Sequence, residues 1–224
     1  MADTFNINLT TEVDADTVDG KGGANTLELS TGVHTLTTNS KLLNIQTIKT
    51  NSSGSQLDLT NQSEDFTIEV GAGTDNIKGG SGADTIKVNS AGQGDADTLD
   101  GGAGTSDILQ LSSGSHSFTD NSKLANVETI KGHASSATTV DLTGQLETLK
   151  VDGGSAGDTI TGGNGDDIIT GGGGDDIIAG GAGDDSLTGN ADNDTFKVDG
   201  GTDTITDLAT GDIVVVSNSA KAQA

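Results

Sequence analysis

The sequence predicts an all-β fold, a parallel β-solenoid in which short strands alternate with turns and stack into coils. The first observation is a run of three nine-residue units, GGNGDDIIT GGGGDDIIA GGAGDDSLT, at residues 162–188. The second is a nine-residue spacing of aliphatic residues, unbroken from Leu142 through Val151 and Ile160 to Val214. The third is a tandem duplication, in which residues 15–49 match residues 96–131. Such repeats indicate units that bury a core only by stacking on their neighbours.

The three consecutive units share one pattern: glycine at positions one, two and four, aspartate at position six and an aliphatic residue at position eight. Glycine permits the positive φ angles of a tight turn and leaves room for carbonyls to point inward. Together with those carbonyls, the position-six carboxylate forms a ligand set of the type that calcium prefers. Positions seven to nine form a short strand whose middle side chain enters the core. Two units close one coil, so Asp158, Asp176 and Asp194 stack on one edge and Asp167, Asp185 and Asp203 on the other.

The pattern GGxGxDxUx resembles the repeat of the RTX family, also called the hemolysin-type calcium-binding repeats. The resemblance implies a right-handed parallel β-roll with two nonapeptides per coil. It also implies several Ca²⁺ ions, each held between two stacked turns by position-six carboxylates and turn carbonyls. By repeat position, the candidate metal-ligating residues are Gly71, Gly73, Asp75, Gly80, Gly82, Asp84, Gly154, Asp158, Gly162, Gly163, Asn164, Gly165, Asp167, Gly171, Gly172, Gly173, Gly174, Asp176, Gly180, Gly181, Ala182, Gly183, Asp185, Asp194 and Asp203. Weaker sites are expected near Asp97, Asp203 and Asp212.

The predicted domain organisation is a single solenoid over residues 1–224, made of two duplicated units and a flexible tail. The first unit covers residues 1–95, the second covers 96–216 with additional nonapeptides, and the tail is 217–224. Segments such as NTLELS and DILQLS alternate apolar and polar residues, as half-buried strands do, and are expected to form metal-poor coils. They resemble strand segments of large bacterial surface proteins, including surface-layer proteins. Loops or widened turns are expected at 46–58, 87–98, 100–108 and 128–141.

Composition limits the function classes. The 224 residues include 35 Gly, no Pro and no Cys, and the net charge is −24. This charge favours dissolved divalent cations as partners and disfavours nucleic acid. Low hydrophobicity with high net charge is also typical of disorder, which is the alternative for the ion-free chain. No apolar run approaches the length of a membrane span.

The sequence predicts no enzyme. The only histidines are His34, His116 and His133, and the first two occupy duplicated positions. This favours inherited surface residues over zinc ligands or catalytic groups. The many carboxylates leave a glycosidase pair open by inventory, but such a site needs aromatic or basic substrate contacts that this chain almost lacks.

Both termini bear on export. MADTFNINLT has no basic region followed by an apolar one, so a Sec-type signal peptide is not expected. The acidic-then-aliphatic segment Asp212–Val216 is similar to type I secretion signals of RTX proteins, although eight further residues follow it; the alternative is simply a last β-strand.

The leading hypothesis is a secreted, calcium-folded structural component of a bacterial surface layer, matrix or filament. Because no capping helix is predicted at either end, end-to-end self-association is also expected. The alternative is a calcium-dependent folding and secretion module of a larger RTX toxin or hydrolase.

Overall fold

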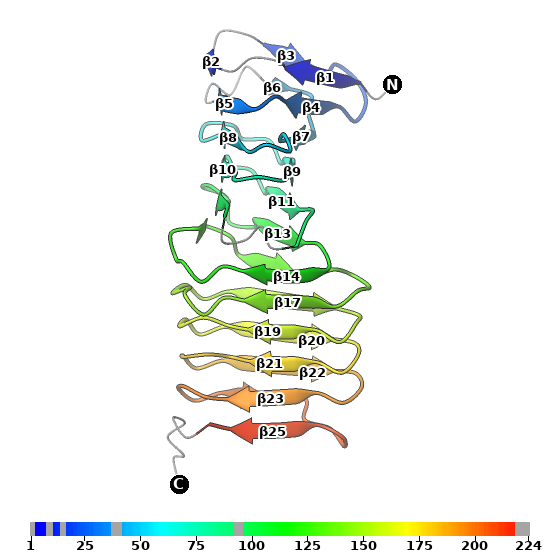
Figure 1. Cartoon of the computed structure of the whole chain (residues 1–224), viewed down its shortest axis with the longest axis vertical. Helices are drawn as coiled ribbons and strands as arrows, with labels where there is room; N and C mark the ends of the chain where they lie inside the picture. Colours follow the sequence, from blue (N-terminus) through cyan, green and yellow to red (C-terminus); the bar gives the residue numbers. More distant parts are fainter. Residues whose placement is uncertain (1–2, 8–10, 14–16, 37–41, 92–95, 218–224) are drawn as a thin grey trace. The chain divides into compact units, whose positions relative to one another are not determined.

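The computed structural model describes residues 3–7, 11–13, 17–36, 42–91 and 96–217. These residues form β-strands joined by turns, with no helix among them (Figure 1). Accordingly, the described part of the chain contains no helix that could cross a membrane. Apart from Ser217, the predicted tail 217–224 lies outside the described residues. The chain divides into two compact units: unit 1 comprises Met1–Gln110 and Ser122–Glu128, and unit 2 comprises Leu111–Asn121 and Thr129–Ala224.

Unit 1 is built from two parallel sheets whose strands alternate along the chain. The strands of its first sheet are β1 (Thr4–Ile7), β4 (Thr26–Leu29), β7 (Thr47–Lys49), β9 (Thr67–Val70), β11 (Thr85–Val88) and β13 (Ile108–Leu111). Those of its second sheet are β2 (Thr11–Val13), β5 (Gly32–Thr35), β8 (Ser55–Asp58), β10 (Asn76–Lys78), β12 (Thr98–Asp100) and β15 (Leu124–Ala125). A separate pair joins β3 (Val18–Asp19) to β6 (Leu42–Leu43).

Unit 2 repeats this arrangement with shorter and more regular coils. The strands of its first sheet are β16 (Thr129–Lys131), β18 (Lys150–Gly154), β20 (Ile168–Gly172), β22 (Ser186–Asn190) and β24 (Thr204–Ile205). Those of its second sheet are β14 (Gly114–Ser117), β17 (Thr138–Asp141), β19 (Thr159–Thr161), β21 (Ile177–Ala179), β23 (Thr195–Val198) and β25 (Ile213–Val216).

Strand register confirms the predicted fold class, a parallel β-solenoid of the β-roll type. In unit 2, Ile169 pairs with Leu187 and Ile160 pairs with Ile178, so partners lie 18 residues apart. Two nonapeptides therefore make one coil. In unit 1 the coils are wider where residues are inserted: Leu27 pairs with Ile48, 21 residues away.

The core is a column of inward-facing, mostly aliphatic side chains, and most of the described strands contribute one or two of them, in line with the nine-residue spacing. Ile68, Ile86, Ile169 and Leu187 are all fully buried, and such burial stabilises each coil by roughly 1.5–3 kcal/mol per side chain.

His34 and His116 also belong to the core, each 1% exposed, and His34 pairs with Leu57 of the next coil. The prediction that these two histidines lie at the surface is wrong. Each is two residues before a buried apolar residue, Leu36 or Phe118, and alternate residues of a strand share a face.

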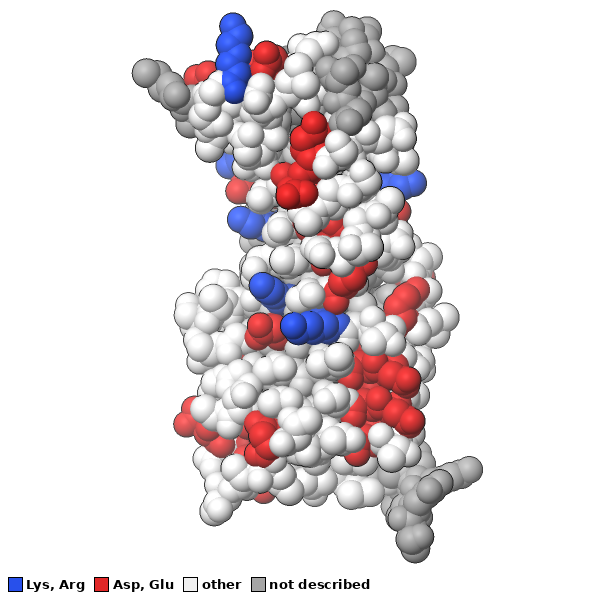
Figure 2. Space-filling model, turned by 180° about the vertical axis from the view of Figure 1, so that it is seen from behind, with Lys and Arg blue, Asp and Glu red and all other residues white. Residues whose placement is uncertain are grey.

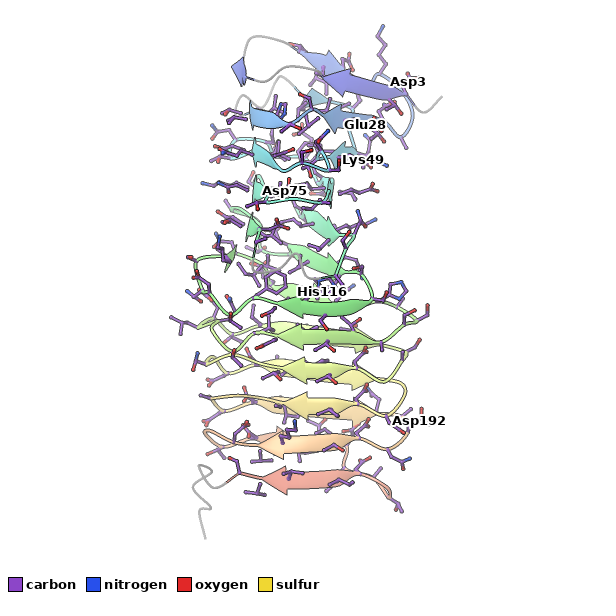
Figure 3. All side chains as sticks on the ribbon, in the orientation of Figure 1. Asp3, Glu28, Lys49, Asp75, His116 and Asp192 are labelled. Atoms are coloured by element: carbon purple, nitrogen blue, oxygen red, sulfur yellow. The ribbon has the colours of Figure 1, made fainter. Side chains whose placement is uncertain are left out.

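The outer face of the first sheet in unit 1 carries charges of alternating sign. Glu28 is in register with Lys49, Lys49 with Glu69, and Glu69 with Lys87. Figure 3 labels Glu28 and Lys49 on the neighbouring strands β4 and β7. The Lys49 Nζ lies 3.0 Å from the Glu69 carboxylate. Each exposed pair contributes at most about 1 kcal/mol. However, a stacking order that skipped one strand would place glutamate beside glutamate or lysine beside lysine, and is therefore disfavoured.

Candidate metal centre

In the regular turns of unit 2, the aspartate folds back over the glycine five residues before it, the turn's first residue. A Cβ added at Gly162 would lie 2.6 Å from Asp167 Oδ2, and one added at Gly153 would lie 2.6 Å from Asp158 Oδ2. At these two turns the first residue must therefore be glycine, because any other residue would displace the carboxylate. Position four favours glycine for a second reason in some turns: Gly174 and Gly183 have φ values of 89° and 124°, which other residues rarely adopt.

The aspartates form two columns in each unit, one at the turns before the first sheet and one at the turns before the second. In each column, a carboxylate accepts a hydrogen bond from a main-chain N–H one coil earlier. Asp158 N donates to Asp176 Oδ1 at 2.7 Å, and Asp176 N donates to Asp194 Oδ1 at 2.9 Å. On the other edge, Asp167 N donates to Asp185 Oδ1 at 2.8 Å. The predicted stacking at intervals of 18 residues is thus the geometry of the structure.

The columns are complete in both units. In unit 2 the second-sheet column contains Asp158, Asp176, Asp194 and Asp212, and the first-sheet column contains Asp167, Asp185 and Asp203. In unit 1 the second-sheet column contains Asp75 and Asp97, and the first-sheet column contains Asp84, Asp107 and Glu128. Every aspartate that the sequence nominated as a ligand lies in one of these columns.

The sequence reasoning missed Asp107 and Glu128. Asp84 N donates to Asp107 Oδ1 at 2.7 Å, and Asp107 N donates to Glu128 Oε2 at 2.7 Å. Residues 101–107, GGAGTSD, carry one residue more than the standard turn, and this insertion placed them in a predicted loop. The GGAG start followed by an acidic residue is the signal that could have found this turn.

The remaining nominated residues contribute main-chain groups to the same turns. Asn164 N donates to Gln145 O at 2.8 Å and Ala182 N to Gly163 O at 3.0 Å, so position three ties each turn to the preceding coil. The main-chain carbonyl of the first residue in the next coil's turn also lies near this carboxylate: Gly171 O would be 2.5 Å from a Cβ added at Gly153. A carboxylate oxygen and a carbonyl oxygen thus converge on the same point above the first glycine.

The second carboxylate oxygen of several aspartates is buried without a hydrogen-bond partner. Among the described residues these atoms are Oδ2 of Asp75, Asp97, Asp107, Asp158, Asp176, Asp185 and Asp203. The first six of these residues are at most 2% exposed, and Asp203 is half-buried. A buried acceptor without a partner costs about 1–3 kcal/mol, and more when it is charged. The arrangement is therefore incomplete without a positive group beside these oxygens.

The pKa values of the aspartates are raised because these carboxylates are buried close to one another. Burial, together with the stacked carboxylates of Asp194 and Asp158, raises the pKa of Asp176 to about 7. Burial raises the pKa values of Asp97, Asp107 and Asp185 to about 6, with smaller contributions from neighbouring carboxylates.

The donor set fits Ca²⁺ better than a transition metal. Among the described residues, no group of three His, Cys, Asp or Glu side chains comes together. A site here would instead combine carboxylates of adjacent coils with turn carbonyls, and an all-oxygen set of this kind suits Ca²⁺. A bound cation would supply the positive charge that the buried oxygens lack.

Comparison with known families identifies these turns. Residues 67–90, 152–187 and 173–205 match the family described as RTX calcium-binding nonapeptide repeat (4 copies). The chain carries RTX calcium-binding repeats. The RTX segments include most of the turns whose Oδ2 atoms are buried without partners, whereas Asp97, Asp107 and Glu128 lie outside them. No curated protein and no solved structure matches the chain.

Negative charge is concentrated on the surface of the RTX repeats. In unit 2 the residues that precede the column aspartates, such as Asp166, Asp175 and Asp184, are exposed. Figure 2 shows carboxylates gathered in red patches over the coils of this unit. Asp192, labelled in Figure 3, is likewise exposed at a turn, and its carboxylate accepts a hydrogen bond from Gly174 N, one coil earlier, at 3.0 Å.

In the calcium-free chain, protonation of the column aspartates at low pH should partly replace the bound cation. The folded-state pKa values of Asp176, Asp185 and Asp107 lie above the ordinary carboxyl value, so the calcium-free fold binds extra protons. Its stability is therefore highest near pH 4 and falls as the pH rises through 6–7. We expect more β-structure by far-UV circular dichroism at pH 5 than at pH 8 in calcium-depleted buffer. More structure at pH 8 would contradict this reading of the columns.

Proposed function

We propose that this chain is a secreted protein that folds on binding extracellular calcium and acts as a structural component of a bacterial surface layer, matrix or filament. The observation that carries the proposal is the position of the RTX aspartates. Each column links successive coils, so an ion bound there would join one coil to the next. In this role calcium is a building element of the fold, and the role is non-catalytic.

Secretion is proposed on the basis of the RTX repeats, which are typical of proteins exported by type I systems. Folding that depends on calcium also suits export, because an unfolded chain is the form that such a route transports. A calcium-poor cytosol would keep the chain unfolded, and the extracellular medium would fold it.

Assembly is proposed because, among the residues that the structure describes, β25 has an apolar edge with no strand paired to it. β25 pairs with β23 and ends its sheet. Its four residues, Ile213 to Val216, are between 41% and 61% exposed, and Leu208 nearby is 57% exposed. Natural proteins usually protect such an edge with charge, proline or a covering segment, because an exposed edge pairs with other chains.

We therefore expect the chain to self-associate through β25 in millimolar calcium. Light scattering should show a mass well above the 22.2 kDa monomer, and electron microscopy should show linear or layered particles. Val216→Lys should weaken this association by placing charge on the edge strand. The matched control is Thr161→Lys, an outward-facing site on β19 within the same sheet. A monodisperse monomer at high protein concentration would rule out the assembly role while leaving calcium binding intact.

A further inference from the structure

One turn of unit 1 has the glycine turn's shape but carries asparagine in place of aspartate. In residues 20–25, GKGGAN, Asn25 occupies position six, five residues after Gly20, and is fully buried. Asn25 Oδ1 accepts a hydrogen bond from Asp3 N at 3.0 Å, and Asn25 N donates to Gln46 Oε1 at 2.8 Å. Asn25 thus continues the same ladder of side-chain and main-chain bonds that the aspartates form.

The second polar atom of Asn25 is a donor. Its Nδ2 donates to the carbonyls of Gly20 and Asn44, both at 2.9 Å, with a longer contact of 3.3 Å to Gly23 O. The two amide hydrogens serve the two short bonds. The reverse amide orientation would place an oxygen against three carbonyls and turn the NH2 group towards the N–H of Asp3, so the hydrogen-bond network fixes the orientation.

Nδ2 occupies the place that Oδ2 occupies in an aspartate turn. A Cβ at Gly20 would meet Asn25 Nδ2, just as a Cβ at Gly101 would meet Asp107 Oδ2, an oxygen that is buried without a hydrogen-bond partner. The carbonyl of the next coil lies beside both, Asn44 O at Gly20 and Asn126 O at Gly101. In the aspartate turn two oxygens therefore face each other and need a cation between them. In the Asn25 turn the amide hydrogens satisfy the carbonyls directly.

Two glutamines close turns in a related way. Gln62 and Gln145 are 0% and 1% exposed and stand at matching places in the two copies of the duplication. Gln145 Nε2 donates to Phe118 O at 2.5 Å and to Asp120 O at 3.3 Å, and Gln62 Nε2 donates to Leu36 O.

Each glutamine turn lies directly before the first aspartate turn of its first-sheet column. Gln145 O accepts the N–H of Asn164, and Gln62 O accepts the N–H of Ser81. At position six these turns carry buried Leu149 and Phe66, so they hold no carboxylate that would need a cation. The first-sheet column of each unit therefore begins on a turn that is already closed.

We propose that the carboxamide nitrogens of Asn25, Gln62 and Gln145 take the place of calcium in their turns. These coils then form without the ion and provide the ordered edge on which the aspartate turns fold when calcium binds. The inference rests on calcium being the ion of the aspartate turns, as the proposed function states. It assigns these three residues the role of deciding which turns require the ion.

The test is hydrogen exchange of the full chain and of Asn25→Asp, in chelator and in millimolar calcium. In the wild type, β4 and β7 should be equally protected in both conditions. In Asn25→Asp, their protection should fall at least about tenfold in chelator and return with calcium, because the turn would then hold a carboxylate facing carbonyls. Equilibrium dialysis should find more calcium bound to this variant than to the wild type.

Two further variants make the comparison sharper. Asn25→Leu removes both the acceptor and the donor, so its β4 protection should be low with and without calcium. Asp107→Asn makes the reverse change at the position that the duplication matches to Asn25, and it should give β13 protection that survives the chelator. Wild-type protection of β22 and β23 reports on the proposed function alone and should rise with calcium.

Asn25→Asp with wild-type protection in chelator would overturn the proposal, since the carboxamide would then be dispensable. Asn25→Asp that stays unprotected in calcium would overturn it as well, since the turn would then not be one that an ion can complete. If wild-type β22 ignored calcium, the proposed function would fail, whatever Asn25 does.

Discussion

Millimolar calcium is expected to convert the chelator-treated chain from a largely unfolded form to the full parallel β-solenoid. The columns of carboxylates are the reason. Two ionised carboxylates one coil apart, at about 4.8 Å, repel by roughly 3–4 kcal/mol at an effective dielectric near 20. The pairs Asp158–Asp176 and Asp176–Asp194 alone would then cost about 7 kcal/mol, comparable with the ~5–15 kcal/mol by which small proteins are stable.

The dependence on concentration follows from linkage. Because the ion binds the folded turns and hardly binds the unfolded chain, stability rises with the logarithm of free calcium. Above the dissociation constant, each tenfold increase in calcium adds about 1.4 kcal/mol per site. Extracellular modules bind calcium at ~10⁻⁴–10⁻³ M, so the folding transition should fall in that range.

Far-UV circular dichroism in chelator and then in a calcium titration measures this transition. Millimolar magnesium is the matched control: it should replace calcium poorly, because Mg²⁺ demands near-ideal octahedral geometry and releases its water reluctantly. An identical β-spectrum in chelator and in calcium would show that the columns do not need the ion. Any structure that remains in chelator should come from the coils closed by Asn25, Gln62 and Gln145.

The sequence predicted most of the fold in unit 2 because both the register and the columns depend only on two nonapeptides per coil. Ile169 over Leu187 and Asp167 over Asp185 follow directly from that count. The prediction failed where one residue is inserted. In GGAGTSD the extra residue projects into solvent, as the exposure of Thr105 and Ser106 shows, and Asp107 keeps its buried place. A strict nine-residue count cannot detect an insertion that the turn absorbs at the surface.

Other features were not visible in the pattern for chemical reasons. Glutamine is usually an exposed residue, so nothing in the sequence marks Gln62 or Gln145 as a buried donor to main-chain carbonyls. The inward orientation of His34 was in fact predictable, because Leu36, two residues away in the same alternating segment, is a core residue. Histidine as a residue type favours the surface, but here strand alternation determines the orientation of the side chain.

Asp176→Ala is expected to raise the calcium midpoint of folding by about two- to tenfold. The substitution removes one carboxylate from a column in which Asp176 contacts the coils on both sides. It also leaves the buried N–H of Asp158 without its acceptor, at a cost of about 1–3 kcal/mol. Several calcium ions bind in one cooperative folding transition, so the free-energy cost is divided among them. The calcium midpoint therefore rises less than it would if a single ion had to offset the whole cost.

Two controls separate the column from the general effect of charge. Asp175→Ala removes the same charge from the neighbouring residue of the same turn, where the side chain is exposed and accepts a hydrogen bond from Asn193 N. Glu28→Ala removes a charge from the outer face of β4, far in sequence from the RTX turns. Both variants should leave the calcium midpoint within about twofold of the wild type, because exposed charges contribute little.

Asp176→Asn distinguishes the ligand role of this residue from its hydrogen-bonding role. Asparagine keeps an oxygen that can accept the N–H of Asp158 but removes the charge, so fewer calcium ions should bind. In chelator it should retain more β-structure than Asp176→Ala, since the ladder bond survives and two stacked repulsions are lost. Measured calcium midpoints that are equal for Asp176→Ala and Asp175→Ala would show instead that the buried carboxylate columns are not where the ion binds.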